Sequence, residues 1–130
     1  MCTFSVPGTH GKCRPRFARG GAVYRDPADS DWEAKVAEAY RAAGGRRLEG
    51  PVAVTVDIYR PLPKGRPKRV ASEPDTARPD ADNILKAVMD ALNGVAYHDD
   101  SQVAYALAVK HDRERGVMER TEVEVLPMPR

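Results

Sequence analysis

The sequence lacks several features that would place it in a specialised class of protein. Its 130 residues include two cysteines, so no disulfide framework is implied. No apolar run approaches the length of a membrane span, and the N-terminus shows no signal-peptide pattern. With 42% hydrophobic and 31% charged residues, the composition is that of an ordinary globular protein. We therefore expect a cytoplasmic protein that makes no contact with membranes.

The two cysteines also bear on metal binding. With His10 between them, Cys2 and Cys13 offer three metal ligands, but their spacing matches no zinc-binding pattern. We interpret them instead as two reduced thiols on neighbouring strands.

The net charge is small, at +2, but the basic residues are unevenly distributed. In KCRPRFAR they alternate, so an extended chain would project them from one side. A second group lies in residues 60–79, where five prolines and one glycine argue against a helix or an inner strand. We expect a long basic loop there. The candidate DNA-binding residues are Lys12, Arg14, Arg16, Lys64, Arg66, Lys68 and Arg69.

The hydrophobic pattern predicts one α+β domain over residues 1–130, with a small mixed or antiparallel sheet packed against two helices. The first helix is expected to begin at Ser30 or Asp31 and to end at Gly44-Gly45. Short strands are expected around TFSV, RPRFAR and AVYR, and PVAVTVDIY alternates as a half-buried strand. QVAYALAVKH and ERTEVEVLP also alternate, and we expect them to form an antiparallel hairpin.

The most informative stretch is RPDADNILKAVMDALNGVAYHDDSQV, residues 78–103, which holds five aspartates. It predicts a helix that ends at Asn93-Gly94 and buries one apolar arc between Ile84 and Leu92. The opposite arc is polar and carries Asp82, Asn83, Lys86 and Asp90.

Two interpretations of the aspartates remain open at this level. In the first, Asp80 or Asp82 caps the helix. Asp82, Lys86 and Asp90 then form an i,i+4 ladder along its surface. In the second, Asp80 and Asp82 meet the aspartate pair at 99–100 where the chain returns beside the helix as a strand. Three carboxylates within about 5 Å repel by around 3 kcal/mol per pair at an effective dielectric of 20, so they require a hard cation such as Mg²⁺ or Mn²⁺.

The same stretch, up to its DDSQV end, resembles the signature of the RusA-type Holliday junction resolvases, which are endodeoxyribonucleases common in phages and prophages. FSVPG, KCRPRF and VYRDPADSDWE resemble the more variable N-terminal half of that family. The resemblance implies a RusA-like fold and a homodimer. It also implies that the substrate is four-way junction DNA, cut at two sites during DNA recombination and repair.

The resemblance further assigns roles to individual residues. It implies that Asp80, Asp82 and Asp100 bind Mg²⁺, with Mn²⁺ as an alternative, and that Lys86 belongs to the catalytic site. Such a site hydrolyses a phosphodiester with metal assistance, and a lysine there offsets negative charge on the phosphate. Supporting roles around the metal are expected for Asn83, Asp90 and Asp99.

Three functions compete at this stage. They are a structure-selective endonuclease of the RusA type, a less selective metal-dependent DNA nuclease, and a nucleic-acid-binding module whose aspartates only cap a helix. Cleavage of a junction compared with a duplex separates the first two, and metal-dependent cleavage of any DNA excludes the third.

Overall fold

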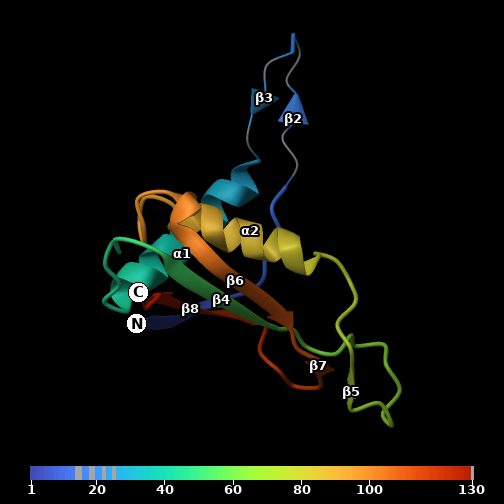
Figure 1. The fold of residues 1–130 in the computed structure, drawn as a ribbon. Coiled ribbons are helices and arrows are strands. Elements are labelled where there is room, and N and C mark those ends of the chain that lie inside the picture. Colours follow the sequence, from blue (N-terminus) through green and yellow to red (C-terminus); the bar gives the residue numbers. More distant parts are fainter. Residues whose placement is uncertain (14–15, 18–19, 22, 25, 130) are drawn as a thin grey trace.

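The computed structural model describes the whole chain except residues 14–15, 18–19, 22, 25 and 130 (Figure 1). For residues 16–17 and 23–24 it describes the backbone alone. The described part contains two α-helices, one four-stranded sheet and two small two-stranded sheets. In chain order the elements are β1 (Cys2–Pro7), β2 (Arg16–Phe17), β3 (Val23–Tyr24), α1 (Pro27–Ala42), β4 (Val52–Tyr59), β5 (Ser72–Glu73), α2 (Ala81–Leu92), the short 3-10 helix η1 (Asp100–Gln102), β6 (Val103–Lys110), β7 (Arg113–Glu114) and β8 (Arg120–Pro127).

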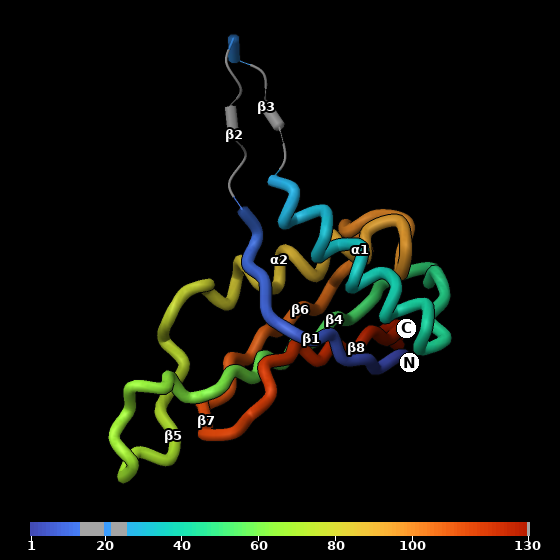
Figure 2. The backbone as a smooth tube through the Cα atoms, turned by 180° about the vertical axis from the view of Figure 1, so that it is seen from behind, coloured from blue at the N-terminus to red at the C-terminus, as the bar shows by residue number. Residues whose placement is uncertain are grey.

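The main sheet is mixed and has the strand order β1-β8-β4-β6. β8 runs antiparallel to both β1 and β4, and β6 runs parallel to β4. Because Cys2 pairs with Val125, the two termini lie side by side (Figure 2). The expected α+β architecture is confirmed.

The expected antiparallel hairpin between the last two long strands is wrong, because β4 lies between them. Val56 of β4 pairs with Ala108 of β6 on one side and with Val123 of β8 on the other. A buried central strand needs hydrogen-bond partners along both edges, and β6 and β8 supply one edge each. The short connection that suggested a hairpin instead contains β7, which pairs with β5.

α1 begins earlier than the sequence suggested. Its N-cap is Asp26, whose carboxylate accepts a hydrogen bond from the Ala28 amide at 2.9 Å, and Pro27 occupies the first helical position. Proline suits that position because its missing N–H would have no partner there. The start predicted at Ser30 or Asp31 is therefore wrong, whereas the end before Gly44 is confirmed.

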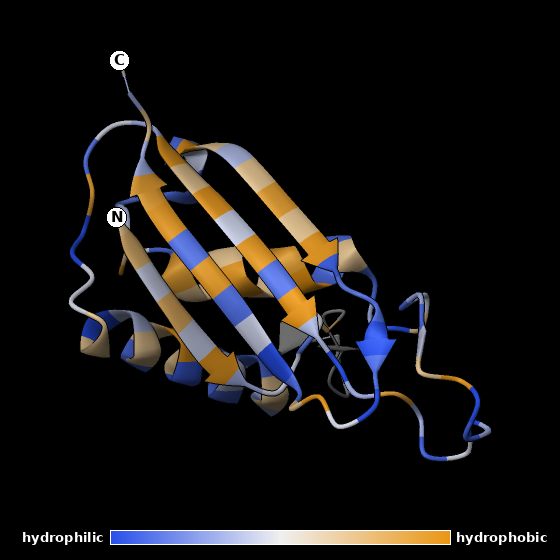
Figure 3. Ribbon diagram, turned by 90° about the horizontal axis from the view of Figure 1, so that it is seen from below, coloured by the Kyte–Doolittle hydropathy of each residue, from blue (hydrophilic) through white to orange (hydrophobic). Residues whose placement is uncertain are grey.

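Both helices cover the same face of the main sheet, and the opposite face is open (Figures 1 and 3). Trp32, Val36 and Tyr40 of α1 are buried against the sheet, as is the apolar arc of α2 around Ile84 and Val88. Burial of each such side chain stabilises the folded state by about 1.5–3 kcal/mol, because apolar surface is removed from water. In the described part of the chain, neither helix is long and apolar enough to cross a membrane.

The basic segment 60–79 is partly ordered by contacts with the turn that follows β6. β5 lies within it and pairs with β7, so that Ser72 is opposite Glu114. The Arg115 guanidinium donates hydrogen bonds to the carbonyls of Pro67 and Val70 at 3.1 and 2.7 Å. The segment therefore has a defined path, which buries Arg60 and exposes Lys64, Arg66, Lys68 and Arg69.

Candidate active site

The start of α2 presents an aspartate that does not act as a side-chain cap. Asp80 is the N-cap residue and has the extended backbone typical of that position, with φ −71° and ψ 153°. Its carboxylate nevertheless makes no capping hydrogen bond, and its side chain is exposed. An aspartate that served as a cap would accept a bond from an amide in the first turn. The capping interpretation therefore does not describe Asp80.

The ladder expected along the polar arc of α2 is also absent. Among the described residues, Asp82 and Lys86 form no ion pair, and both side chains are exposed. Asp90 instead accepts from the Lys12 ammonium at 2.8 Å, and Lys12 also lies 3.6 Å from Glu33 of α1. Because Lys86 lies one turn after Asp82, an exposed cation stands on the same helix face as an exposed carboxylate.

A buried network supports the chain that leads into α2. The guanidinium of Arg60 donates to both carboxylate oxygens of Asp75 and to the carbonyls of residues 77 and 78. Lys110 Nζ donates to the Pro79 carbonyl at 2.9 Å. Burial alone would raise the pKa of Asp75, but the Arg60 hydrogen bonds together with the positive charges of Arg60, Lys110 and Arg113 outweigh it, and the pKa is lowered. This network sets the position of the backbone immediately before Asp80.

The sequence alone did not predict this network. Arg60 follows directly after the end of β4, Lys110 is the last residue of β6, and the two strands are parallel neighbours. The ends of parallel neighbours lie at the same edge of a sheet, which brings these two cations together. The position of a basic residue at the end of each strand would predict the network only once the parallel pairing of β4 and β6 is known.

A shallow hollow lies beside this backbone. Its volume is about 580 Å³. An added Cβ at Gly11 would lie 2.5 Å from the Cβ of Pro79, so glycine allows the N-terminal segment to approach this closely. The Lys12 amide donates to the Asn83 carbonyl at 3.0 Å and fixes the other wall. The hollow is lined by Gly11, Lys12, Arg78, Pro79, Asp80 and Asn83.

The two aspartates of the second acidic group have different surroundings. Asp99 is the N-cap of η1, and its carboxylate accepts from the Ser101 amide at 3.0 Å. That hydrogen bond lowers the pKa of Asp99. Gln102 completes a capping box by accepting from the Asp99 amide at 3.2 Å. Asp99 thus has a structural contact, whereas Asp100 is exposed in the first turn of η1.

Within a single chain, the two acidic groups lie at opposite ends of α2. Asp80 and Asp82 lie at its start, and Asp100 follows the turn after its end (Figure 1). The Tyr97 hydroxyl fastens that turn to the helix end by donating to the Met89 carbonyl at 2.7 Å. Twelve helical residues span about 18 Å. The oxygen ligands of one Mg²⁺ ion lie about 3 Å apart.

The strand after Asp100 does return beside α2, as the sequence suggested, but the aspartate pair stands at its far end. β6 ends at Lys110, which contacts the backbone next to Asp80. Eight residues of strand separate the two positions by about 26 Å. Among the described residues, one group of three metal-ligating side chains converges to within 4.8 Å, and it contains none of these aspartates.

The candidate DNA-binding residues fall into three groups. The half-buried Lys12 is engaged with Asp90; burial alone would lower its pKa, but the ion pair outweighs it and the pKa is raised. Arg14 and the side chain of Arg16 lie outside the described residues. Arg66 is exposed and donates to Glu73 at 2.8 Å. Exposed side chains are also found for Lys64, Lys68 and Arg69.

Comparison with known proteins connects this arrangement to a family. The family model described as Endodeoxyribonuclease RusA matches residues 7–126, which is nearly the whole chain. A protein of Bacillus subtilis (strain 168), described as uncharacterized protein YqaN, is similar as well. It is 37% identical over 112 residues, which cover 77% of this chain and 78% of that protein.

Proposed function

The chain belongs to the RusA family of endodeoxyribonucleases, which are metal-dependent Holliday junction resolvases, and on this premise we propose that it cuts four-way junctions with Mg²⁺ as its cofactor. The observation that carries the proposal is the exposed carboxylate of Asp80, which occupies an N-cap position without capping the helix. In a structural role, a carboxylate oxygen would accept a hydrogen bond from a backbone amide in the first turn of the helix. A catalytic role requires it to remain exposed.

The residues at the start of α2 fit a hard divalent cation. Asp80 and Asp82 offer oxygen ligands, which Mg²⁺ prefers, and Asp80 lines an open hollow. When bound, such an ion stabilises charge on the phosphate and lowers the pKa of a coordinated water. Lys86 would bind a phosphate oxygen from the adjacent turn of the helix, and Asn83 would orient a water at the rim.

A third carboxylate has to come from elsewhere, because Asp100 of the same chain lies beyond the other end of α2. We propose that the partner's Asp100 completes each site in a homodimer. β6 supplies the geometry for this. If two copies pair antiparallel along β6 about a two-fold axis, the start of one β6 lies beside the end of the other. The end of β6 contacts Pro79 through Lys110, so the partner's Asp100 would arrive next to Asp80.

The surface of β6 suits such pairing. Among the described residues, β6 is an edge strand of the main sheet, with β4 on one side and no strand on the other. Tyr105 and Leu107 are 49% and 41% exposed. In register they stand opposite Ala53 and Thr55 of β4, on the sheet face that the helices leave open. An exposed apolar edge strand favours pairing with a second chain, and a two-fold interface uses the same patch on both copies.

Cleavage of a synthetic four-way junction tests the activity. With Mg²⁺ we expect paired nicks in opposing strands, and with a chelator we expect binding without cleavage. Cleavage of linear duplex at the same rate would instead indicate a less selective nuclease. Binding without any metal-dependent cleavage would indicate a nucleic-acid-binding module.

Mixing two inactive variants tests the composite site. In a dimer of Asp80→Asn with Asp100→Asn, one site carries both substitutions and the other is intact if each site takes Asp100 from the partner. An equal mixture in which the chains exchange freely would then recover about a quarter of the wild-type sites. If all three aspartates came from one chain, every site would carry a substitution and the mixture would stay inactive.

A further inference from the structure

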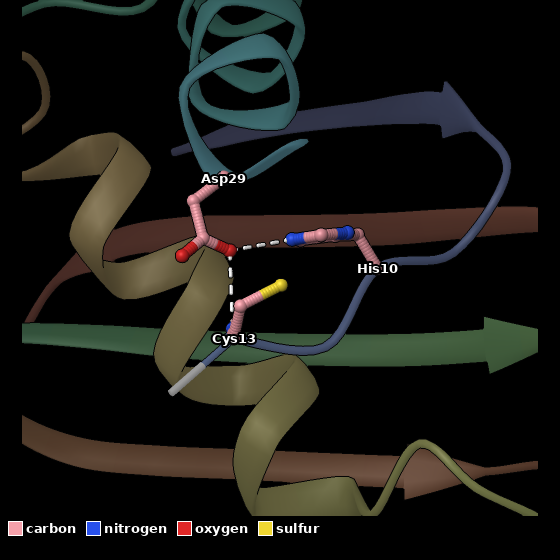
Figure 4. A group of neighbouring side chains, drawn as sticks. All are labelled: His10, Cys13 and Asp29. Carbon is pink, nitrogen blue, oxygen red and sulfur yellow. Dashed lines mark hydrogen bonds and ion pairs between the residues drawn. The ribbon is translucent and has the colours of Figure 1, made fainter. Parts of the chain in front are cut away.

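His10, Cys13 and Asp29 form a second cluster of metal-ligating side chains, away from the aspartates of α2. His10 Nε2 lies 2.7 Å from Asp29 Oδ1, and the Cys13 amide donates to the same oxygen at 3.1 Å. One ligand atom from each residue falls within 4.8 Å of the other two. Figure 4 shows the three side chains gathered at the start of α1.

The cluster joins segments that are separated by β2 and β3. His10 and Cys13 lie between β1 and β2, and Asp29 lies in the first turn of α1, just after β3. The basic residues Arg14 and Arg16 follow directly after Cys13 in the chain. A link across the cluster would therefore hold together the two ends of the segment 14–25.

The Asp29 carboxylate is buried, and the residue is 3% exposed. One of its oxygens, Oδ1, contacts both the His10 ring and the Cys13 amide. The His10 and Asp29 side chains already touch, and a cation bound between them would replace the proton of that hydrogen bond, because metal ligands bind in their deprotonated forms.

Two buried polar atoms close to the cluster have no hydrogen-bond partner among the described residues. They are Trp32 Nε1 and Thr9 Oγ1. The Trp32 ring centroid lies 5.9 Å from that of His10, and Thr9 precedes His10 in the chain. A buried donor without an acceptor is unfavourable, so an additional oxygen ligand near His10 would be stabilised there.

We propose that His10, Cys13 and Asp29 bind Zn²⁺, or a similarly thiophilic divalent cation, and clamp the segment that carries β2 and β3 to the start of α1. Thiolate, imidazole and carboxylate are the ligands that Zn²⁺ takes, whereas Mg²⁺ does not bind thiolates. Ligand atoms of a tetrahedral site lie about 3.5 Å apart, so the present arrangement needs small side-chain rotations to close. The site differs from the Mg²⁺ site in position, ligand type and role.

Cobalt binding to the purified, chelator-treated protein tests this site without reference to cleavage. Co²⁺ bound to a thiolate gives a near-ultraviolet charge-transfer band, which carboxylate ligands alone do not produce. We expect one such site per chain, with the band lost on addition of Zn²⁺ and retained in excess Mg²⁺. Wild-type protein should also unfold at a higher temperature with Zn²⁺, because a ligand that binds only the folded state stabilises it.

The two cysteines allow a matched control. Cys13→Ala should abolish the band and the Zn²⁺-dependent stabilisation, whereas Cys2→Ala should keep both, since Cys2 is buried elsewhere beside the Tyr40 and Ala43 carbonyls. Asp29→Asn should weaken Co²⁺ binding by about 10- to 100-fold. His10→Gln, with its fold checked by circular dichroism, provides a variant that keeps both cysteines. A band that survives in Cys13→Ala, or no band in the wild type, would leave the cluster as a hydrogen-bonded brace and overturn the proposal.

Discussion

Arg60 donates hydrogen bonds to both carboxylate oxygens of Asp75, from Nε to Oδ2 at 2.8 Å and from Nη2 to Oδ1 at 2.6 Å. Both residues are 8% exposed. The same guanidinium donates to the carbonyls of residues 77 and 78, three and two positions before Asp80. The pair therefore connects the end of β4 to the start of α2, and it makes the position of Asp80 depend on a buried ion pair.

Arg60→Lys should lower both stability and cleavage. A lysine cannot bind a carboxylate through two parallel hydrogen bonds, so part of the buried charge of Asp75 is left uncompensated. We expect a loss of about 3 kcal/mol in the free energy of unfolding, measured by urea titration. Cleavage should fall further than binding does, because the backbone before Asp80 loses its support. Arg41→Lys, an exposed change near the end of α1, is the control and should change neither quantity appreciably. Equal stability of the two variants would contradict the role given to Arg60.

Acid should destabilise the protein partly through Asp75. Its folded-state pKa lies below its ordinary value of 3.8, so its contribution to stability is complete above that value. The contribution is lost as the pH falls from there toward the folded-state pKa. Asp75→Asn removes this titration, so its stability should fall less steeply with decreasing pH in that window. Urea titrations of both proteins between pH 5 and about 2.5 measure the difference in slope. Parallel curves would show that another group dominates acid unfolding.

Asp82→Asn should separate a catalytic carboxylate from a structural one. Asparagine is nearly isosteric and equally compatible with the first turn of a helix, so the fold should be retained. Mg²⁺-dependent cleavage should fall by about a hundredfold or more, because a neutral amide is a poor ligand for a hard cation. Junction binding without metal should persist or tighten, since one negative charge near the phosphate is removed. Asp31→Asn, an exposed change on α1, is the control. Wild-type cleavage by Asp82→Asn would refute the assignment.

The exposed cations of segment 60–79 should contribute to DNA affinity through phosphate contacts. Each contact adds about −0.9 to the slope of log affinity against log salt concentration, so Lys68→Ala combined with Arg69→Ala should make the slope less negative by about 1.8. Gel-shift titrations from low to moderate salt measure it. Lys35→Ala on α1 should leave the slope unchanged. If the double variant keeps the wild-type slope, the segment does not contact phosphates.

Leu107→Asp should disrupt the homodimer. It places a charge in the middle of the β6 edge, where both copies would bury it. Light scattering should then give the monomer mass of 14.3 kDa, against twice that mass for the wild type. Cleavage should be lost with the dimer, because each site lacks the partner's Asp100. Met118→Asp is the control, as Met118 is 73% exposed and lies outside β6. A monomeric wild type at micromolar concentration, with and without junction DNA, would contradict the dimer.

Local patterns in the sequence were sufficient to predict α2, the three long strands β4, β6 and β8, and membership of the family. The apolar arc from Ile84 to Leu92 predicted α2 because a helix buries one face at a period of 3.6 residues, and Asn93-Gly94 marked its end. Alternation predicted β4, β6 and β8 in the same way. Family membership also followed from a contiguous string of residues, since spacing along the chain is what a signature records.

Tertiary structure alone decided how these elements meet. β4 separates β6 from β8 because a buried strand must satisfy both of its edges, and no local pattern specifies which strands do so. That arrangement sends β6 back along α2 and leaves Asp100 at the far end from Asp80. The contacts of Arg60 with Asp75 and of His10 with Asp29 bridge 15 and 19 positions of the chain. Such pairs arise from the packing of separate segments, and neither periodicity nor capping encodes them.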